Sequence, residues 1–172
     1  MKKSTANDYR VDGEFAFLIL TTRDPGITIE AIIDVAQLDR VISAGRWYAV
    51  LDTRSNGHYY VVHCRTLQRL HRFLIDAQPD MVVDHINHNT LDCRLTNLRE
   101  CTRSENNANR SGATSLSTSG VKNVNWDSHR QRWRVAITKD GKKHRFGSFA
   151  SIAEAENVAI KARIEIHGEF AG

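Results

Sequence analysis

The sequence predicts an α+β protein built as two modules joined by a flexible linker. Runs rich in β-branched and aromatic residues recur along the chain, at 15–20, 47–51 and 133–139 for example. Apolar residues at helical spacing are confined to a few segments, the longest of which covers 152–167. Small polar residues fill 111–119 and mark a linker. We therefore expect a mixed N-terminal region and a C-terminal three-stranded antiparallel sheet packed on one helix.

Composition and charge are those of a globular protein. The 172 residues are 41% hydrophobic and 26% charged, with a net charge of +4. No apolar run approaches the roughly 20 residues that a membrane helix needs, and the first ten residues lack the apolar core of a secretion signal. Cys64, Cys93 and Cys101 contain no Cys-x-x-Cys pair, which argues against a disulfide framework or a zinc ribbon. We expect a cytoplasmic protein with three core cysteines and no membrane partner.

The first third of the chain reads as strands with one short helix. Residues 1–14 are polar and are expected to fray. A buried strand is predicted at 15–20, followed by a turn at Asp24-Pro25-Gly26. The apolar positions after that turn fit a strand over 27–33 and a short helix near 35–42.

A hairpin and an amphipathic helix are predicted next. The β-rich runs 47–51 and 59–62 are separated by Ser55-Asn56-Gly57, which has good turn chemistry. The following helix is predicted over 66–76 from apolar residues at helical spacing, which are Leu67, Leu70, Phe73 and Leu74.

The stretch after this helix predicts a β-β-α unit. Residues 81–85 read as a strand, a polar loop follows, and 95–101 is a second extended piece. Thr102 and Glu105 form a capping box, with Thr102 as N-cap and Glu105 at the third helical position. This box places Asn106 in the first turn of a short helix, packed across the hairpin.

The polar residues of this unit suit the cutting of a phosphodiester with one metal ion. The Asp84 carboxylate is a hard oxygen ligand of the kind a divalent ion prefers, and an Asn amide oxygen supplies a second. The His85 imidazole can deprotonate water near neutral pH. Asn97 can hydrogen-bond the backbone and hold the loop after His85.

These motifs resemble the HNH nuclease family, with its ββα-metal site, over roughly residues 66–110. The resemblance is carried by Leu70-His71-Arg72, Val83-Asp84-His85-Ile86-Asn87, Asn97-Leu98-Arg99 and Thr102-Arg103-Ser104-Glu105-Asn106. It is to the subgroup found in bacteriophage and intron-encoded homing endonucleases. The departures are His88, where the family often has Gly, and Cys93, where Asn is common.

The resemblance implies a role for each residue of the unit. Asp84 and Asn106 would be the metal ligands, with Asn107 as the alternative to Asn106, and His85 and Asn97 would be the catalytic pair. The implied metal is magnesium, with manganese possible, and the implied products carry 5′-phosphate and 3′-hydroxyl groups. A few relatives hold a structural zinc, which the unpaired cysteines do not favour.

The remaining histidines and tryptophans are read as follows. His71 is open between packing and phosphate positioning, and His88 is read as a solvated loop residue. Trp47 and Trp133 are expected in the core, whereas Trp126 is open between core and groove contact. Ordinary surface or hairpin positions are expected for His58, His63, His129, His144 and His167.

The C-terminal module, residues 120–172, is predicted to be a small α+β unit. Strands are expected at 121–126, 133–139 and 144–149, with a strong hairpin signal at Asp140-Gly141. A capping box at Ser151 and Glu154 should open an Ala-rich helix that ends at Gly168. Its buried face is expected to comprise Ala155, Val158, Ala159, Ala162 and Ile166.

Positive charge gathers on this module. Residues 120–149 carry eight Lys or Arg and two Asp, hence about +6, which leaves the remainder near −2. Charge clustered in this way is the electrostatic footprint of a nucleic-acid binder.

The module also resembles the DNA-binding domain of plant ethylene-response factors, over about residues 117–171. The resemblance is carried by the order Gly120-Val121, Trp126, Arg132-Trp133, Ala136-Ile137, Gly141-Lys142, Gly147-Ser148-Phe149, Glu154-Ala155 and Gly168-Glu169-Phe170. In that family the sheet lies in the major groove of DNA. The candidate DNA contacts are Lys122, Trp126, Arg132, Arg134, Lys139, Lys142 and Arg145. Thr138 stands where plant members often have Arg, so their base preference is not transferred.

The two resemblances together imply a metal-dependent homing-type endonuclease, with residues 1–110 as the HNH domain. Its partner would be double-stranded DNA, and it would act as a monomer or weak dimer in a bacterial or phage-infected cell. The alternative is a DNA-binding regulator with a vestigial nuclease fold. An RNA-binding protein is disfavoured because the C-terminal sheet shows no exposed aromatic pair for stacking bases.

Overall fold

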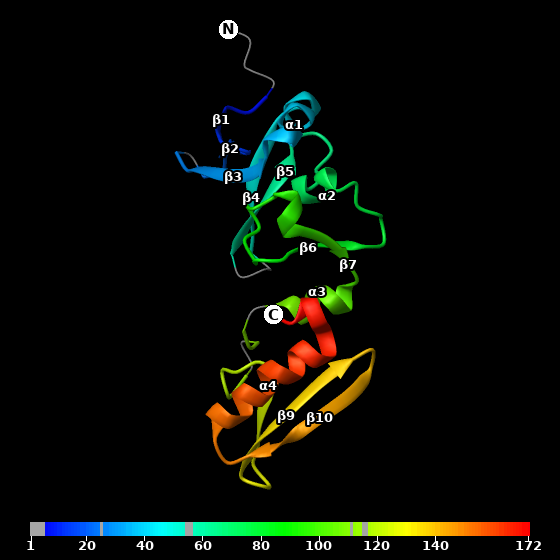
Figure 1. Ribbon diagram of the computed structural model, residues 1–172. Coiled ribbons are helices and arrows are strands. Elements are labelled where there is room, and N and C mark those ends of the chain that lie inside the picture. The colour runs from blue at the N-terminus through cyan, green and yellow to red at the C-terminus, as the bar shows by residue number, and fades with distance from the viewer. Residues whose placement is uncertain (1–5, 25, 54–56, 111, 115–116) are drawn as a thin grey trace. The chain divides into compact units, whose positions relative to one another are not determined.

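The computed structural model describes residues 6–24, 26–53, 57–110, 112–114 and 117–172. Its contacts divide the chain into two compact units, Met1–Cys101 and Thr102–Gly172, each of which mixes antiparallel strands with short helices (Figure 1). The α+β class is therefore confirmed. The division lies ahead of the predicted linker at 111–119, of which residues 111, 115 and 116 lie outside the described part. In that part, no helix is long and apolar enough to cross a membrane.

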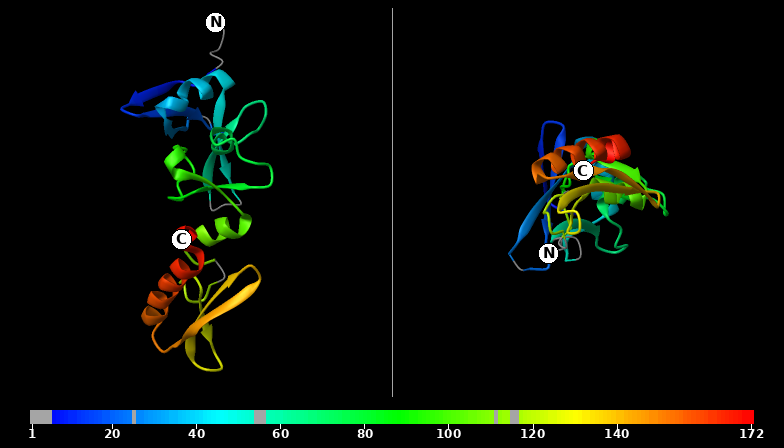
Figure 2. Two further views of the ribbon diagram at one scale, coloured as in Figure 1. Left: turned by 45° about the vertical axis from the view of Figure 1, so that its right-hand side comes forward. Right: turned by 90° about the horizontal axis from the view of Figure 1, so that it is seen from below.

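A three-stranded sheet opens the first unit (Figure 2). Its strands, in spatial order, are β1 (Tyr9–Asp12), β2 (Phe15–Thr21) and β3 (Thr28–Asp34). Strand β1 contradicts the expectation that residues 1–14 fray. The reason is the buried Asn7 side chain, whose amide nitrogen donates to Trp47 O and Ile19 O and whose oxygen accepts from Trp47 N. These bonds tie the start of β1 to two strands of the core.

The middle of the first unit contains the predicted hairpin. After β3 come η1 (Val35–Gln37), α1 (Leu38–Ala44), β4 (Trp47–Asp52) and β5 (His58–His63). Residues 55 and 56 of the turn predicted at 55–57, and residue 25 of the turn predicted at 24–26, lie outside the described residues. Trp47 is buried, as predicted, but His63 is buried too, which contradicts its surface assignment. The His63 ring lies edge-on to Trp47 and bonds Ala44 O and Thr66 Oγ1.

The predicted helix over 66–76 is much shorter in the structure, where α2 covers only Leu70–Leu74. Arg69 is extended and forms an antiparallel bridge with Val62 of β5. Leu67 adopts a positive φ of 58° in the turn that leads to this bridge, and Cys64 in the same turn is exposed, against expectation. The pairing of Arg69 with β5 therefore prevents the helix that the spacing of apolar residues predicts before Leu70. Cys93 and Cys101 are buried, as predicted.

A second hairpin completes the first unit. It consists of β6 (Val82–His85), η2 (Leu95–Asn97) and β7 (Leu98–Cys101). The predicted extended piece 95–101 thus begins with one turn of 3₁₀ helix. A common core joins the elements of this unit, and its largest buried side chains include Leu18, Leu20, Ile33, Trp47 and Leu70.

The second unit is a three-stranded sheet with helices. Its elements are α3 (Arg103–Asn109), β8 (Val124–Asp127), β9 (Arg132–Lys139), β10 (Lys142–Phe149), α4 (Ile152–His167) and η3 (Gly168–Phe170). The predicted hairpin at 140–141 is present, and both residues have positive φ, as a type I′ turn requires. Helix α4 covers one face of the sheet (Figure 1).

Helix α4 buries three alanines, which let it approach the sheet closely. Ala155, Ala159 and Ala162 are buried as predicted, whereas Val158 and Ile166 are half-buried. The helix ends at Gly168, as predicted. The predicted capping box at its start is wrong, because Ser151 is the N-cap residue but makes no side-chain capping bond.

Candidate functional site

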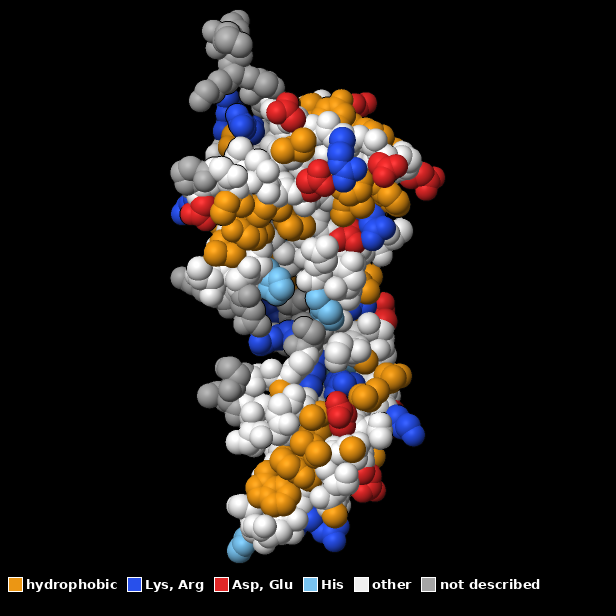
Figure 3. Space-filling view, turned by 90° about the vertical axis from the view of Figure 1, so that its left-hand side faces the viewer, with side chains coloured by type: hydrophobic (Ala, Val, Ile, Leu, Met, Phe, Trp, Pro, Cys, Tyr) orange, Lys and Arg blue, Asp and Glu red, His pale blue; other side chains and the backbone are white. Residues whose placement is uncertain are grey.

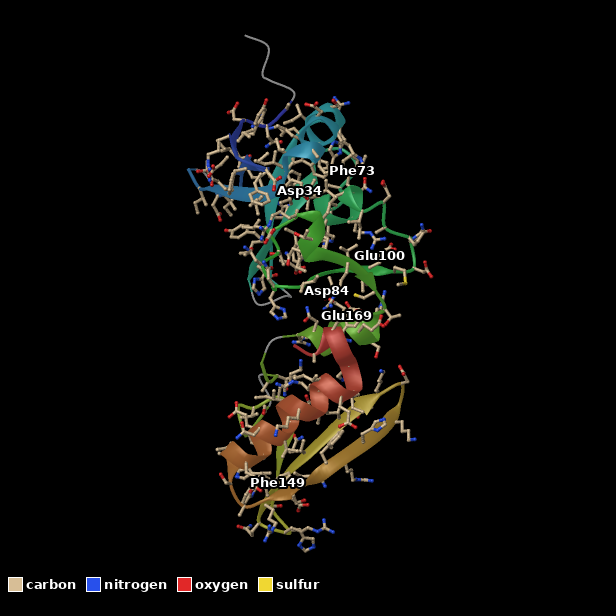
Figure 4. All side chains as sticks on the ribbon, viewed as in Figure 1. Asp34, Phe73, Asp84, Glu100, Phe149 and Glu169 are labelled. Carbon is tan, nitrogen blue, oxygen red and sulfur yellow. The ribbon has the colours of Figure 1, made fainter. Side chains whose placement is uncertain are left out.

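The β6–β7 hairpin carries the adjacent Asp84 and His85 at the end of β6. Figure 4 labels Asp84 on this hairpin. The register pairs Asp84 with Arg99 and His85 with Leu98. Both residues are buried and retain only 6% and 5% of their full exposure. Two buried, ionisable neighbours at the end of a strand are unusual for a purely structural hairpin, because each must be desolvated.

Arg99 holds the Asp84 carboxylate. Its Nε and Nη2 atoms donate to the same Asp84 oxygen, Oδ2, at 3.0 and 2.8 Å. The two side chains expose only 12% and 7% of their surface. The guanidinium therefore offsets the cost of burying this carboxylate. Arg99 is not among the site residues predicted from the sequence, although the register of the hairpin could have placed it opposite Asp84.

His85 lies in an aromatic cluster with Tyr60 and His71. The His71 and His85 rings meet edge to face, with centroids 4.9 Å apart, and Tyr60 lies edge-on to both. Burial lowers the pKa of His85 to about 4, despite the opposing effect of Asp84 and Asp92. Burial also holds the pKa of His71 well below 6.5. Both imidazoles are therefore neutral at pH 7, and the buried position of His71 favours packing over a direct phosphate contact.

Asn97 ties the loop after His85 to the hairpin. Its side-chain oxygen accepts from Asn87 N at 3.0 Å, and its side-chain nitrogen donates to Asp92 O at 2.7 Å. Its main-chain oxygen accepts from Ile86 N at 3.0 Å. The expected backbone bonding by Asn97 is thus present. These bonds fix the chain on both sides of the loop that follows His85.

Side-chain bonds also order the loop itself. Asn87 Oδ1 accepts from Asn89 N, and Asn89 Oδ1 accepts from Leu91 N, so two successive Asx-type turns shape it. Asp92 is buried and accepts from Asn87 and from Arg94. Burial acts to raise the pKa of Asp92, but these hydrogen bonds outweigh it and hold the pKa below its usual value. The half-exposed His88 lies within this loop, at φ 64°.

Main-chain bonds dock this loop on the central strands. Ile32 N donates to Leu91 O at 2.9 Å, and Cys93 N donates to Ile32 O at 2.8 Å. The Thr90 hydroxyl donates to Tyr59 O. Because β3 and β5 hold the loop from two directions, the position of His85 is set by the core of the whole first unit.

The capping box that precedes Asn106 is present as predicted. Thr102 Oγ1 accepts from Glu105 N at 3.2 Å, and Glu105 Oε2 accepts from Thr102 N at 2.8 Å. Asn106 lies in the first turn of α3, and its main-chain nitrogen donates to Thr102 O. Helix α3 belongs to the second unit, whereas Asp84, His85 and Asn97 share one hairpin of the first.

The candidate ligands have the chemistry that magnesium prefers. Among the described residues, His, Cys, Asp and Glu form no group of three or more that could hold a metal ion. The set expected from the sequence, one carboxylate and one amide, needs no such group. Mg²⁺ commonly keeps several waters and takes few protein ligands, all of them hard oxygens. Asp84 therefore fits this metal by donor type, although Arg99 already engages one of its oxygens.

Register sorts the candidate DNA contacts of the second unit onto two faces. On β9, Val135 packs in the core with α4 and Ile137 is buried on the same side, so Arg132 and Arg134 lie on the open face. Ala136 and Thr138 lie on the same face of β9 as Arg134, and their partners on β10 are Arg145 and Lys143. Arg145 and Lys143 therefore lie on the open face as well. Lys143 was not among the DNA contacts predicted from the sequence. We call Arg132, Arg134, Lys143 and Arg145 the basic face.

Three further candidates lie on the helix-covered side of the sheet. Trp126 pairs with Trp133, and the two rings are 4.8 Å apart. Lys139 and Lys142 pair with each other, and Lys139 Nζ donates to Ile166 O of α4. These three candidates therefore lie on the opposite face of the sheet from the arginines. The alternation of side chains along a strand is the physical reason, and Lys139 lies an even number of positions from Val135.

The side chain of Lys122 is held by hydrogen bonds within the second unit. Its ammonium group donates to three main-chain oxygens, those of Ala108, Arg110 and Gly172. Burial lowers its pKa to about 8, and the charges of Arg163 and Arg110 act in the same direction. Because its donors are engaged at the end of α3, the assignment of Lys122 as a DNA contact is not supported by this geometry.

The pair of Trp126 and Trp133 bears on the argument against RNA binding, which assumed that the C-terminal sheet has no exposed aromatic pair. Trp133 is half-buried and packs against the core, as predicted, while Trp126 is 39% exposed beside it. Exposed apolar side chains form a patch on this unit and another on the first unit (Figure 3). The second unit thus has an aromatic pair with one exposed ring, although it lies on the side opposite to the basic face.

Comparisons with known proteins match the part of the chain that contains the β6–β7 hairpin. Residues 77–108 match the family described as HNH endonuclease. Protein 3.8 of Escherichia phage T7 is 38% identical over 89 residues, which are 52% of this chain and 72% of that protein. A protein of Acanthamoeba polyphaga mimivirus named as an uncharacterized HNH endonuclease is 25% identical over 175 residues, which cover 98% of this chain and 86% of the relative. No solved structure matches. Residues 77–108 thus form an HNH endonuclease family domain.

Proposed function

We propose that this protein is a divalent-metal-dependent DNA endonuclease of homing type. The observation that carries the proposal is the buried Asp84–His85 pair at the end of β6, inside the segment that matches the family. Asp84 and Asn106 would hold the metal, magnesium or manganese. When bound, that ion would stabilise charge on the scissile phosphate and the leaving 3′ oxygen.

His85 is the proposed base. Its low pKa keeps the imidazole neutral at pH 7, so a ring nitrogen can accept a proton from the attacking water. Asn97 keeps the adjoining loop in place through its bonds to Asn87 and Asp92. The proposed products carry 5′-phosphate and 3′-hydroxyl groups. A monomer would nick one strand, and a weak dimer would be needed to cut both at once.

The basic face is proposed to bind double-stranded DNA, as the sheet of an ethylene-response-factor-type domain does. Its three arginines and Lys143 lie on the side of the sheet that α4 leaves open. Arginine forms bidentate bonds with phosphates and with guanine, so a row of this kind can both bind and orient DNA.

Incubation of plasmid DNA with the protein and Mg²⁺ tests this function. Wild-type protein should convert supercoiled DNA to nicked or linear forms, and His85→Ala should not. His129→Ala, which removes an exposed histidine of the second unit, is the matched control and should cut normally. Equal cleavage by the wild type and by a correctly folded His85→Ala protein would refute the assignment.

A DNA-binding regulator with a vestigial site is the second candidate. One observation favours it, because Arg99 occupies an oxygen of the carboxylate that would bind the metal. Tight DNA binding without nicking in either Mg²⁺ or Mn²⁺ would support this reading over the first.

A further inference from the structure

Among the ion pairs of the described residues, that between Arg99 and Asp84 is the one in which both side chains are largely buried. Arg10 and Glu30, for comparison, each expose almost half of their side chains. Arg99 and Asp84 lie directly opposite on paired strands, and two guanidinium N–H groups converge on one oxygen. A pair with this geometry holds its carboxylate in one rotamer and offsets most of its charge.

A metal ion at Asp84 would meet this guanidinium. Two cations on one carboxylate repel each other, and the repulsion is strong where water is largely excluded. The groups that hydrogen-bond a histidine ligand are usually acceptors, which raise its metal affinity, whereas an ionised carboxylate ligand can only accept hydrogen bonds, so its partners are donors. A donor that also carries a full positive charge, as Arg99 does, should lower the affinity of the carboxylate for a metal ion.

We infer that the Arg99 guanidinium occupies the Asp84 carboxylate in place of a metal ion. It keeps metal binding weak until a DNA phosphate is present to accept the hydrogen bonds of the guanidinium. This inference rests on the proposed function, in which Asp84 is a metal ligand. Arginine is suited to the exchange because its planar donors match a phosphate as well as a carboxylate. The consequence is reciprocal: metal should tighten DNA binding, and DNA should tighten metal binding by the same factor.

Metal binding without DNA gives the first test. Mn²⁺ is titrated into the full chain, and free Mn²⁺ is followed by electron paramagnetic resonance. Arg99→Gln should bind Mn²⁺ about tenfold more tightly than the wild type, in the range typical of partners of metal ligands but with the opposite sign. Arg94→Gln is the matched control. It removes the ion pair between Arg94 and the buried carboxylate of Asp92, in the loop of the same hairpin, and should leave the affinity for Mn²⁺ unchanged.

Two further variants separate the possible failures. If Asp84→Asn binds Mn²⁺ as the wild type does, Asp84 is not a ligand and the proposed function fails. If Asp84→Asn loses binding but Arg99→Gln is no tighter than the wild type, only the inference about Arg99 is overturned. Arg99→Lys, which keeps the charge, should remain as weak as the wild type, and a tenfold gain in that variant would also overturn it.

DNA binding gives the second test. In the His85→Ala background, affinity for a fluorescent random-sequence duplex is measured with and without Mn²⁺ at constant ionic strength. Mn²⁺ should tighten DNA binding several-fold in this background, and by much less when Arg99→Gln is added. An equal gain in both proteins would show that Arg99 does not couple the two ligands.

Discussion

The rings of His71 and His85 meet edge to face, with centroids 4.9 Å apart and planes at 87°. His85 comes from β6, within the segment that matches the family, but His71 comes from α2, which precedes that segment. Tyr60 of β5 contacts both rings. The surroundings of the proposed base are therefore built by parts of the chain outside the family match.

The buried histidines should make the first unit sensitive to acid. In the unfolded chain His85 protonates near pH 6.5, but in the folded protein it stays neutral down to about pH 4. Its contribution to the free energy of unfolding is thus complete above pH 6.5 and is lost as the pH falls towards 4. The loss from His85 alone should be about 3 kcal/mol.

Urea unfolding of metal-free protein at pH 7.5 and 4.5 measures this loss. Trp126→Phe with Trp133→Phe leaves the buried Trp47 as the fluorescent reporter of the first unit. Adding His71→Phe and His85→Phe removes both titrating groups, while carboxylate effects remain. If the parent and this variant lose the same free energy between the two pH values, the histidines are not the cause.

Asn97→Ala should destabilise the first unit and impair cleavage together. It removes one acceptor and one donor of a buried side chain and leaves Asn87 N and Asp92 O without these partners. The expected loss is roughly 2–4 kcal/mol in the free energy of unfolding. Asn89→Ala, which removes a single bond in the exposed part of the same loop, should cost much less. Comparable losses in the two variants would show that Asn97 does not anchor the loop.

Arg132→Ala with Arg134→Ala should weaken DNA binding without changing the cleavage reaction. The loss of two phosphate contacts should reduce the log–log salt slope of DNA affinity by about 1.8. Cleavage of saturating DNA should persist, because Asp84 and His85 are untouched. Asp84→Ala should do the reverse: in metal-free buffer it should bind DNA about as the wild type does, and with Mg²⁺ it should show no turnover.

Two single variants serve as controls for that experiment. Lys139→Ala removes a cation on the helix-covered side of the sheet, so the salt slope should not change. Lys122→Met should lower the melting temperature of the second unit, since its ammonium group bonds three carbonyls, yet should keep the slope. An unchanged slope in the double Arg variant, or a fall of similar size with Lys139→Ala, would exclude the basic face as the DNA-binding surface.

Most strands could be predicted from the sequence because their signals are local. Strand β2 alternates between the core and the outside, and the turn at Asp140-Gly141 has the dipeptide that a type I′ hairpin needs. The prediction failed where distant partners intervene. Strand β1 depends on Asn7 bonding to Trp47, forty residues away, and α2 is shortened by the bridge between Arg69 and Val62.

By itself, the sequence determined the adjacent Asp84 and His85, the capping box before Asn106 and the hairpin that Asn97 closes. Each of these depends on residues that are near one another in the sequence, at most ten positions apart in the case of Asn97 and Asn87. Only the tertiary structure decided that Arg99 engages Asp84 and that His71 packs on His85. It also decided which cations form the basic face. These relationships depend on strand register and on the packing of elements that are distant in the sequence. A shift of one residue in the register of β6 and β7, for example, would move Arg99 away from Asp84.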